Sequence, residues 1–297
     1  ATRAYFGSTQ LLAAEDGSPV CVVNEGEYCM MNTLDLAVDQ GFFEARFFPW
    51  FSREILDLFA DRHHFVDELK VLGDTRLHAG GVSFCHDMGV RNRFAAPGTS
   101  SYELPDLDGC FSHMTFEEAC NWTLLAGIYL AATADEAWCR GRRILLEGLV
   151  TGLERREHPE RKYRDGCPGT DSARCGTGSE ITTYDSLDPA LAQTRRNLYT
   201  TVKLWAAYLA LERLLRAAAS PEMAHRAAGG AARSAVAVES WPERDGILPA
   251  IAEGRNASAI LPAVEGLVYP VFWKDLDAVS PEGRYGGMVR KLGRHLA

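Results

Sequence analysis

Three carboxylates lie close together near the start of the chain, where Glu25, Glu27 and Asp35 fall within eleven residues. Gly26 separates the two glutamates and gives the backbone the freedom to turn between them. Apolar residues then recur at three- or four-residue spacing, which predicts a helix over residues 33–48. The carboxylates are therefore expected in a loop that feeds a helix N-terminus, where their positions are defined.

Residues 180–189 form a second polar segment, with Asp185 near its middle. Asp188 can cap a helix and Pro189 suits a first helical position, so the segment predicts a helix that runs to about Ala218. The two polar segments thus stand in the same relation to a following helix, and we expect them to face each other.

Two carboxylates brought together from distant loops meet the requirement of glycoside hydrolysis. One attacks the anomeric carbon or activates water, and the other is held protonated and donates its proton to the leaving oxygen. A single Asp or Glu is more often a solvated cap, so the prediction depends on the pairing of the two segments.

The charge and composition of the chain limit the classes of molecule that it is expected to bind. The chain has 297 residues, 46% of them hydrophobic, and a formal net charge of -9. This charge argues against nucleic acid or an anionic membrane as partner and suits a neutral small molecule such as a carbohydrate. No apolar run reaches the roughly 18 residues of a membrane span. The composition leaves a homodimer open.

We expect no metal and no cofactor. The eight cysteines contain no C-x-x-C pair, no G-x-x-x-x-G-K phosphate loop occurs, and no aspartate spacing matches a calcium loop. Cys167 and Cys175 flank a glycine-rich loop, but the cysteines as a set resemble free thiols of a reducing compartment. The expected location is cytoplasmic.

Helical patterns dominate the rest of the chain. A second helix is expected from Ser52 with Phe65 on its apolar side, and Thr115 with Glu118 forms a capping box ahead of another. Residues 73–114 are rich in glycine and proline and are expected to form a functional loop. Helices in pairs, with polar motifs in the loops between them, predict an all-α fold of the (α/α) toroid type.

Several motifs in this order resemble the catalytic domain of the family 52 glycoside hydrolases, which are retaining β-xylosidases. The matching segments are E-G-E-Y at 25–28, M-N-T-L-D at 31–35, H-D-M-G at 86–89, T-Y-D at 183–185, N-L-Y at 197–199 and K-L-W-A at 203–206. The resemblance covers essentially the whole chain. The related family 116 shares several motifs but has one more residue between the two glutamates, so the spacing here favours family 52.

The resemblance implies that Glu25 is the nucleophile and Asp185 the acid/base of a double displacement that releases xylose. Matched motif by motif, the aspartate and histidine that contact the sugar in the related family 116 fall on Asp35 and His86. Glu27 competes with Glu25 as nucleophile on sequence grounds alone, and its alternative role is to hold a neighbouring side chain.

Glu265 is a weaker candidate for lining the sugar site. The rival enzyme is a β-glucosidase of the related family, whose pocket must leave room for a hydroxymethyl group. A hypothesis of a different class is that the chain is an inactive helical fragment.

The resemblance also implies a domain arrangement. Residues 1–297 would be part of an (α/α)6 catalytic domain, with an N-terminal β-sandwich domain and the last toroid helices lying outside this chain. The edges of such a partial toroid would expose apolar stripes. The expected stripes are Leu34, Val38 and Phe42 at one end and Met288, Leu292 and Leu296 at the other.

Overall fold

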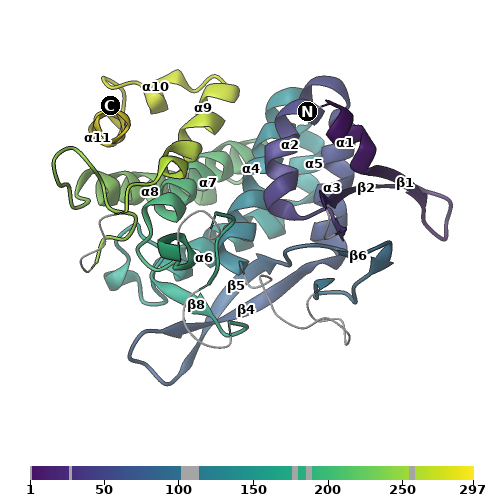
Figure 1. Cartoon of the computed structure of the whole chain (residues 1–297), viewed down its shortest axis with the longest axis horizontal. Helices are drawn as coiled ribbons and strands as arrows, with labels where there is room; N and C mark the ends of the chain where they lie inside the picture. The colour runs from purple at the N-terminus through teal and green to yellow at the C-terminus, as the bar shows by residue number, and fades with distance from the viewer. Residues whose placement is uncertain (1, 27–28, 102–113, 176–179, 185–188, 254–257) are drawn as a thin grey trace.

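The computed structural model describes residues 2–26, 29–101, 114–175, 180–184, 189–253 and 258–297 (Figure 1). Its α-helices are α1 (Thr2–Ser8), α2 (Leu34–Phe47), α3 (Pro49–Arg62), α4 (Thr115–Thr133), α5 (Glu136–Gly141), α6 (Arg143–Glu157), α7 (Leu198–Ala217), α8 (Pro221–Glu239), α9 (Val268–Phe272), α10 (Leu276–Val279) and α11 (Gly286–Leu296). Short 3₁₀ helices are η3 (Arg161–Tyr163), η4 (Pro189–Ala192) and η5 (Leu261–Leu267). The helix expected over residues 33–48 is confirmed as α2.

Two antiparallel sheets accompany the helices. Their strands are β1 (Thr9–Ala13), β2 (Pro19–Glu25), β3 (Met30–Met31), β4 (His64–Val71), β5 (Leu77–Phe84), β6 (Gly89–Val90), β7 (Arg93–Phe94) and β8 (Thr170–Ser172). One sheet has the order β1-β2-β3-β6-β7 and the other β5-β4-β8. The prediction of an all-α toroid is therefore wrong, because strands form two antiparallel sheets, and the first polar segment lies at the end of β2 and in β3.

The burial pattern of β4 explains why hydrophobic periodicity did not predict this strand. Asp67 and Leu69 point inward and Val66 points out, so the strand buries a carboxylate where hydrophobic alternation would place an apolar residue. The register also shifts between Asp67 and Glu68, which breaks the period of two. Phe65, expected on a helix, lies in this strand, and the loop expected over 73–114 contains β5, β6 and β7 among its described residues.

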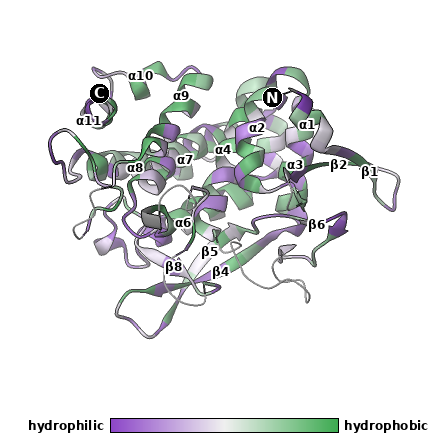
Figure 2. Ribbon diagram, viewed as in Figure 1, coloured by the Kyte–Doolittle hydropathy of each residue, from purple (hydrophilic) through white to green (hydrophobic). Residues whose placement is uncertain are grey.

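Helices α4 and α7 form the centre of the core, and Figure 2 shows the largely hydrophobic surroundings of these helices. A Cβ atom on Gly127 of α4 would lie 3.1 Å from the Ala210 side chain on α7 and 3.1 Å from the Trp273 ring. Only a residue without a side chain permits this approach. The two helices therefore pack closely enough to bring their polar N-terminal turns together.

One expected helix start and one expected capping box are wrong, although α4 does begin at Thr115 as expected. The segment from Pro189 forms only η4, and α7 begins at Leu198, where the Asn197 side chain accepts a hydrogen bond from the Tyr199 amide at 2.9 Å. Thr115 and Glu118 do not form a capping box, since α4 has no side-chain cap and both side chains bind other partners. The pair interpreted as a capping box from sequence instead makes two separate buried polar contacts.

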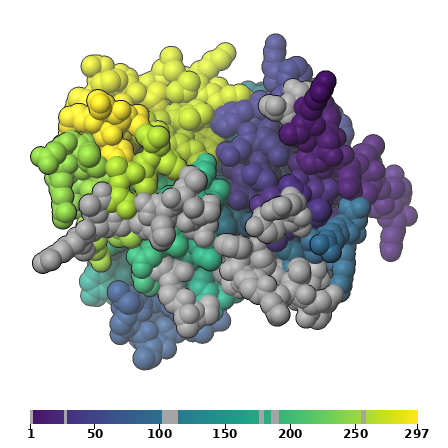
Figure 3. Space-filling view, in the orientation of Figure 1, coloured from purple at the N-terminus to yellow at the C-terminus, as the bar shows by residue number. Residues whose placement is uncertain are grey.

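The expected exposed edges are also mostly wrong. Four residues of the two stripes are buried, as is the apolar face of α7 from Leu198 to Leu209. They are Leu34, Val38, Met288 and Leu292. Phe42 stacks on Tyr269 and meets Phe272 edge-on, with ring centroids 5.6 and 5.2 Å away. Figure 3 shows the N-terminal and C-terminal parts of the chain in contact on this face. Only Leu296, at 49% exposure, behaves as predicted.

A buried ionic network ties the small sheet to the helices. Arg156 of α6 binds Asp67 of β4 and, at 2.5 Å, Glu180. The second oxygen of Glu180 accepts the Phe116 amide at 2.8 Å, and its first oxygen accepts the Ser172 amide at 2.9 Å. One arginine and two carboxylates thus connect α6, β4, β8 and the start of α4.

We predict that Arg156→Ala lowers the free energy of unfolding by about 3 to 5 kcal/mol, because it leaves two buried carboxylates without their cation. Urea denaturation followed by circular dichroism measures the change. The control is Arg140→Ala in the exposed pair with Glu136, which should cost less than about 1 kcal/mol. Equal losses in the two variants would contradict the structural role of Arg156.

Candidate active site

Glu25 is the last residue of β2, where the chain turns toward β3 through Gly26 at φ +36°. Asn32, at φ +50°, fixes the return of this turn. Its side-chain oxygen accepts the Val23 amide at 2.8 Å and its nitrogen donates to the Cys21 carbonyl at 2.9 Å. The half-buried Glu25 side chain is thus held by a rigid strand end rather than by a loose loop.

His86 and Asp35 meet beside this strand end. The Leu34 amide donates to the His86 carbonyl at 2.9 Å, which joins the N-terminus of α2 to the segment after β5. Asp35, in the first turn of α2, is 9% exposed, and His86 is more deeply buried. The structure therefore brings together the two residues that sequence comparison placed against a sugar.

Asp87 orients the imidazole. Its carboxylate receives hydrogen bonds from the Gly89 amide at 2.8 Å, the Ser101 amide at 2.8 Å and the Ser101 hydroxyl at 2.9 Å. The remaining contact is with Nδ1 of His86 at 3.0 Å. Nδ1 of His86 is thus the ring nitrogen that binds Asp87, which fixes the orientation of the imidazole.

Glu118 of α4 completes the group, although sequence analysis assigned it only to a cap. Ligand atoms of Asp35, His86 and Glu118 all lie within 4.8 Å of one another. Oε2 of Glu118 accepts a hydrogen bond from Asn121 at 3.1 Å, whereas Oε1 has no hydrogen-bond partner among the described residues. A buried carboxyl oxygen without a partner is costly, and a ligand hydroxyl would satisfy it.

The electrostatics of this group are strongly coupled. Burial lowers the pKa of His86, but the hydrogen bond to Asp87 and the charge of Asp35 outweigh it and raise the pKa to about 10. Burial and the charge of Asp35 raise the pKa of Glu118 well above its usual value. Burial, followed by repulsion from Asp35, also raises the pKa of Glu25. These shifts favour the imidazolium form of His86 and the neutral form of Glu118.

The same three side chains are the only group among the described residues with the spacing of a metal site. Metal binding needs a neutral imidazole, and the raised pKa of His86 opposes its deprotonation. The same donor set also suits sugar hydroxyls, which accept and donate hydrogen bonds.

A second buried cluster holds the segment that leads to Asp185. The Thr183 amide and hydroxyl donate to Glu117 at 2.9 and 2.6 Å. Lys203 of α7 donates to the same carboxylate at 2.9 Å, and Tyr199 also binds it. Burial raises the pKa of Glu117, but the Lys203 charge and these hydrogen bonds hold it below its usual value.

Glu265 belongs to this second cluster. Its Oε1 lies 3.2 Å from the Lys203 ammonium and accepts the Tyr269 hydroxyl at 2.9 Å. Its Oε2 is buried and has no partner among the described residues. The structure thus joins Glu265 to Thr183 through Lys203 and leaves one oxygen open. Glu27 and Asp185 lie outside the described residues, and their positions stay predictions.

Sequence analysis missed Glu117, Glu118 and Lys203. The available signals were two adjacent glutamates in the first turn of an apolar helix and one lysine within the apolar arc of α7. Charges in such positions need partners, so their presence alone indicates a polar cluster at the end of the core.

Comparisons with known proteins cover the whole chain. Residues 1–129 match the sequence model of glycosyl hydrolase family 52. A protein of Geobacillus stearothermophilus named β-xylosidase is 47% identical over 296 residues, which is 100% of this chain and 42% of the relative. A second β-xylosidase of that organism is 43% identical over 216 residues, or 73% of this chain and 35% of the relative.

The chain spans less than half the length of these two curated relatives. The motifs that carry the resemblance, from E-G-E-Y through H-D-M-G, fall within the 129 residues matched by the family model. These matches confirm the family resemblance: the chain is a protein like the catalytic domain of glycosyl hydrolase family 52.

Proposed function

We propose that this chain supplies the catalytic carboxylates of a retaining exo-β-1,4-xylosidase. The observation that carries the proposal is the group at the end of β2: the half-buried Glu25 beside Asp35, His86 and the unsatisfied oxygen of Glu118. The two relatives named β-xylosidase support the choice of xylosides as substrates. Residues 1–297 would then form part of the catalytic domain.

In this proposal Glu25 attacks the anomeric carbon while Asp185 protonates the leaving oxygen, and Asp185 then activates the water that releases xylose. The His86 imidazolium donates to one sugar hydroxyl, and Asp35 accepts from another. The protonated Glu118 supplies a further donor through its unpartnered oxygen. Glu27 holds a neighbouring side chain, and Glu265 offers its open oxygen to the substrate from the second cluster.

The second cluster is the support for the acid/base. Two hydrogen bonds fix Thr183 to Glu117, and Tyr184 meets the Tyr199 ring edge-on at 5.2 Å. Thr183 and Tyr184 directly precede Asp185 in the sequence, and the carboxylate that holds Thr183 is also paired with Lys203. A positioned acid is what proton transfer to a leaving group requires.

In this proposal the site binds a xylo-oligosaccharide. The proposal also includes assembly of the protein as a homodimer. Among the described residues, no helix combines the length and apolar composition that crossing a bilayer requires. Cys21, Cys120, Cys139 and Cys167 are buried free thiols. We include a cytoplasmic location in the proposal because free thiols persist in a reducing compartment.

The first test concerns the nucleophile. In an active preparation of the protein, Glu25→Gln should lower kcat on an aryl β-xyloside by at least about 10⁴-fold, because the covalent step is lost. Glu27→Gln should impair turnover far less. A mechanism-based fluoro-xyloside should label Glu25, and peptide mapping locates it. A label on Glu27 would reverse the assignment, and faster turnover of an aryl β-glucoside than of the xyloside would favour the β-glucosidase.

The second test concerns stereochemistry. A retaining pair requires the carboxyl groups of Glu25 and Asp185 to lie about 5 to 5.5 Å apart, whereas an inverting pair lies about 6.5 to 9.5 Å apart. We expect proton NMR of the first turnovers to show β-xylose before mutarotation, and a crystal structure to show the shorter distance. Initial release of α-xylose would rule out the double displacement.

The third test uses pH. Repulsion from Asp35 contributes to the raised pKa of Glu25, so the acid limb of kcat/KM should lie above pH 4.5. Asp35→Asn removes that charge and should move the limb to lower pH while reducing kcat/KM roughly 10- to 100-fold through the lost hydrogen bond. Glu136→Gln makes the same charge change at an exposed position and should leave the limb in place. A limb that stays or rises in Asp35→Asn would contradict the coupling.

A further inference from the structure

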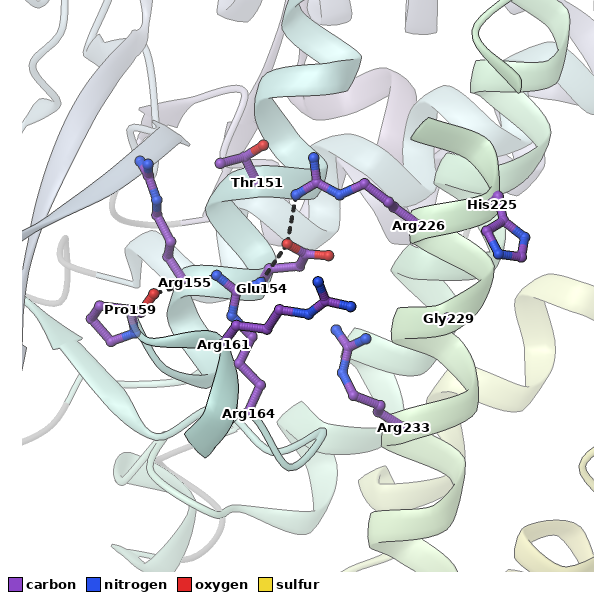
Figure 4. A pocket seen from close by; sticks show the side chains of 10 residues that line it. All are labelled: Thr151, Glu154, Arg155, Pro159, Arg161, Arg164, His225, Arg226, Gly229 and Arg233. Carbon is purple, nitrogen blue, oxygen red and sulfur yellow. Dashed lines mark hydrogen bonds and ion pairs between the residues drawn. The ribbon is translucent and has the colours of Figure 1, made fainter. Parts of the chain in front are cut away.

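A cavity of about 750 Å³ opens between α6, η3 and α8, and arginines dominate its lining. They come from three elements of the chain, and His225 joins them at the rim. The arginines are Arg155, Arg161, Arg164, Arg226 and Arg233. In Figure 4 the side chains of Arg161, Arg226 and Arg233 point into the space between α6 and α8, whereas His225 points away from it.

The described carboxylates at this cavity do not balance its charge. Glu154 is shared by Arg164 at 2.5 Å and Arg226 at 2.7 Å. Glu157 neutralises Arg233 at 2.8 Å. The cavity is therefore lined by five arginines and one glutamate, with Glu157 paired to Arg233, in a chain whose formal net charge is -9. Such a local excess of positive charge against the sign of the whole chain attracts anions.

Arg155 and Arg161 carry the excess, since neither forms an ion pair with any described residue. Arg161 is exposed and Arg155 half-buried, so both can reach a ligand without breaking an existing contact. The other guanidinium groups are held in place. Arg164, for example, also donates to the His158 carbonyl at 3.0 Å. A cavity with fixed donors and two available cations loses little freedom on binding.

The chemistry of the lining selects the ligand class. Arginine presents a planar fork of donors that matches phosphoryl and carboxylate oxygens, and the cavity carries no lysine. Its lining contains no Phe, Tyr or Trp, and the imidazole of His225 points away from it, so no aromatic ring is presented to stack a nucleobase. The volume lies within the range of small-molecule sites. A dianionic phosphoryl group offers more acceptors to this many donors than a single carboxylate does.

We propose that this arginine-lined cavity binds a small phosphorylated compound, at a site separate from the glycosidase carboxylates. An acidic sugar with a carboxylate shares part of this chemistry, and the experiment must distinguish the two. The proposal is independent of the xyloside activity, because its test measures binding alone.

The test is isothermal titration calorimetry of the protein with sodium pyrophosphate and with sodium glucuronate, at an ionic strength fixed with sodium chloride. We expect saturable one-to-one binding of pyrophosphate and at least tenfold weaker binding of glucuronate. Arg155→Gln/Arg161→Gln should weaken pyrophosphate binding by about 10-fold or more, because two charged donors are lost.

The matched control is Arg3→Gln/Arg46→Gln, which makes the same charge change at exposed positions of α1 and α2. It should bind as the wild type does. Circular dichroism checks that both variants fold, and Arg161→Gln alone, at an exposed position, repeats the test with the smallest structural change. The proposal is overturned by non-saturable binding of pyrophosphate, by equal binding in the pocket variant and the wild type, or by tighter binding of glucuronate.

Discussion

Two adjacent buried carboxylates in the first turn of α4 set the arrangement of the candidate site. Glu117 faces Lys203 and the segment before Asp185, while Glu118 faces His86 and Asp35. Neighbouring residues on a helix point about 100° apart, so one turn can serve two clusters. Any shift of α4 would therefore disturb both clusters at once, which is why its close packing on α7 matters.

The loss of water on burial is compensated in different ways at the two carboxylates. Glu117 keeps its charge because Lys203 and three hydroxyl or amide donors compensate for the lost water. Glu118 has only Asn121 as a described hydrogen-bond donor, and its raised pKa favours the neutral form. A neutral carboxyl next to an imidazolium can donate or accept as a ligand requires. The fixed pair thus positions the backbone, and the neutral group is the one available to substrate.

The polar motifs could be located from sequence, but their supports could not. Glu25, Asp35 and His86 were identified because their spacing matches a family, and the structure brings the last two into one group. The fold class was wrong because periodicity reports hydrophobic burial, and β4 buries Asp67 instead of an apolar residue. Glu118 was misread for a related reason: a glutamate near a helix start resembles a cap, and only the tertiary partners show that it is buried.

The consecutive residues Arg155 and Arg156 give a second example of charged side chains whose roles cannot be told apart from sequence. Arg156 points inward and is matched by Asp67 and Glu180, so its charge holds the fold together. Arg155, one residue earlier on α6, is a lining residue of the cavity and has no described ion-pair partner. Compensation by two carboxylates makes the inward arginine structural, and lack of compensation makes the outward one available to a ligand. Residue type and position are almost the same, so the distinction between the two roles depends entirely on which residues the fold places opposite each guanidinium.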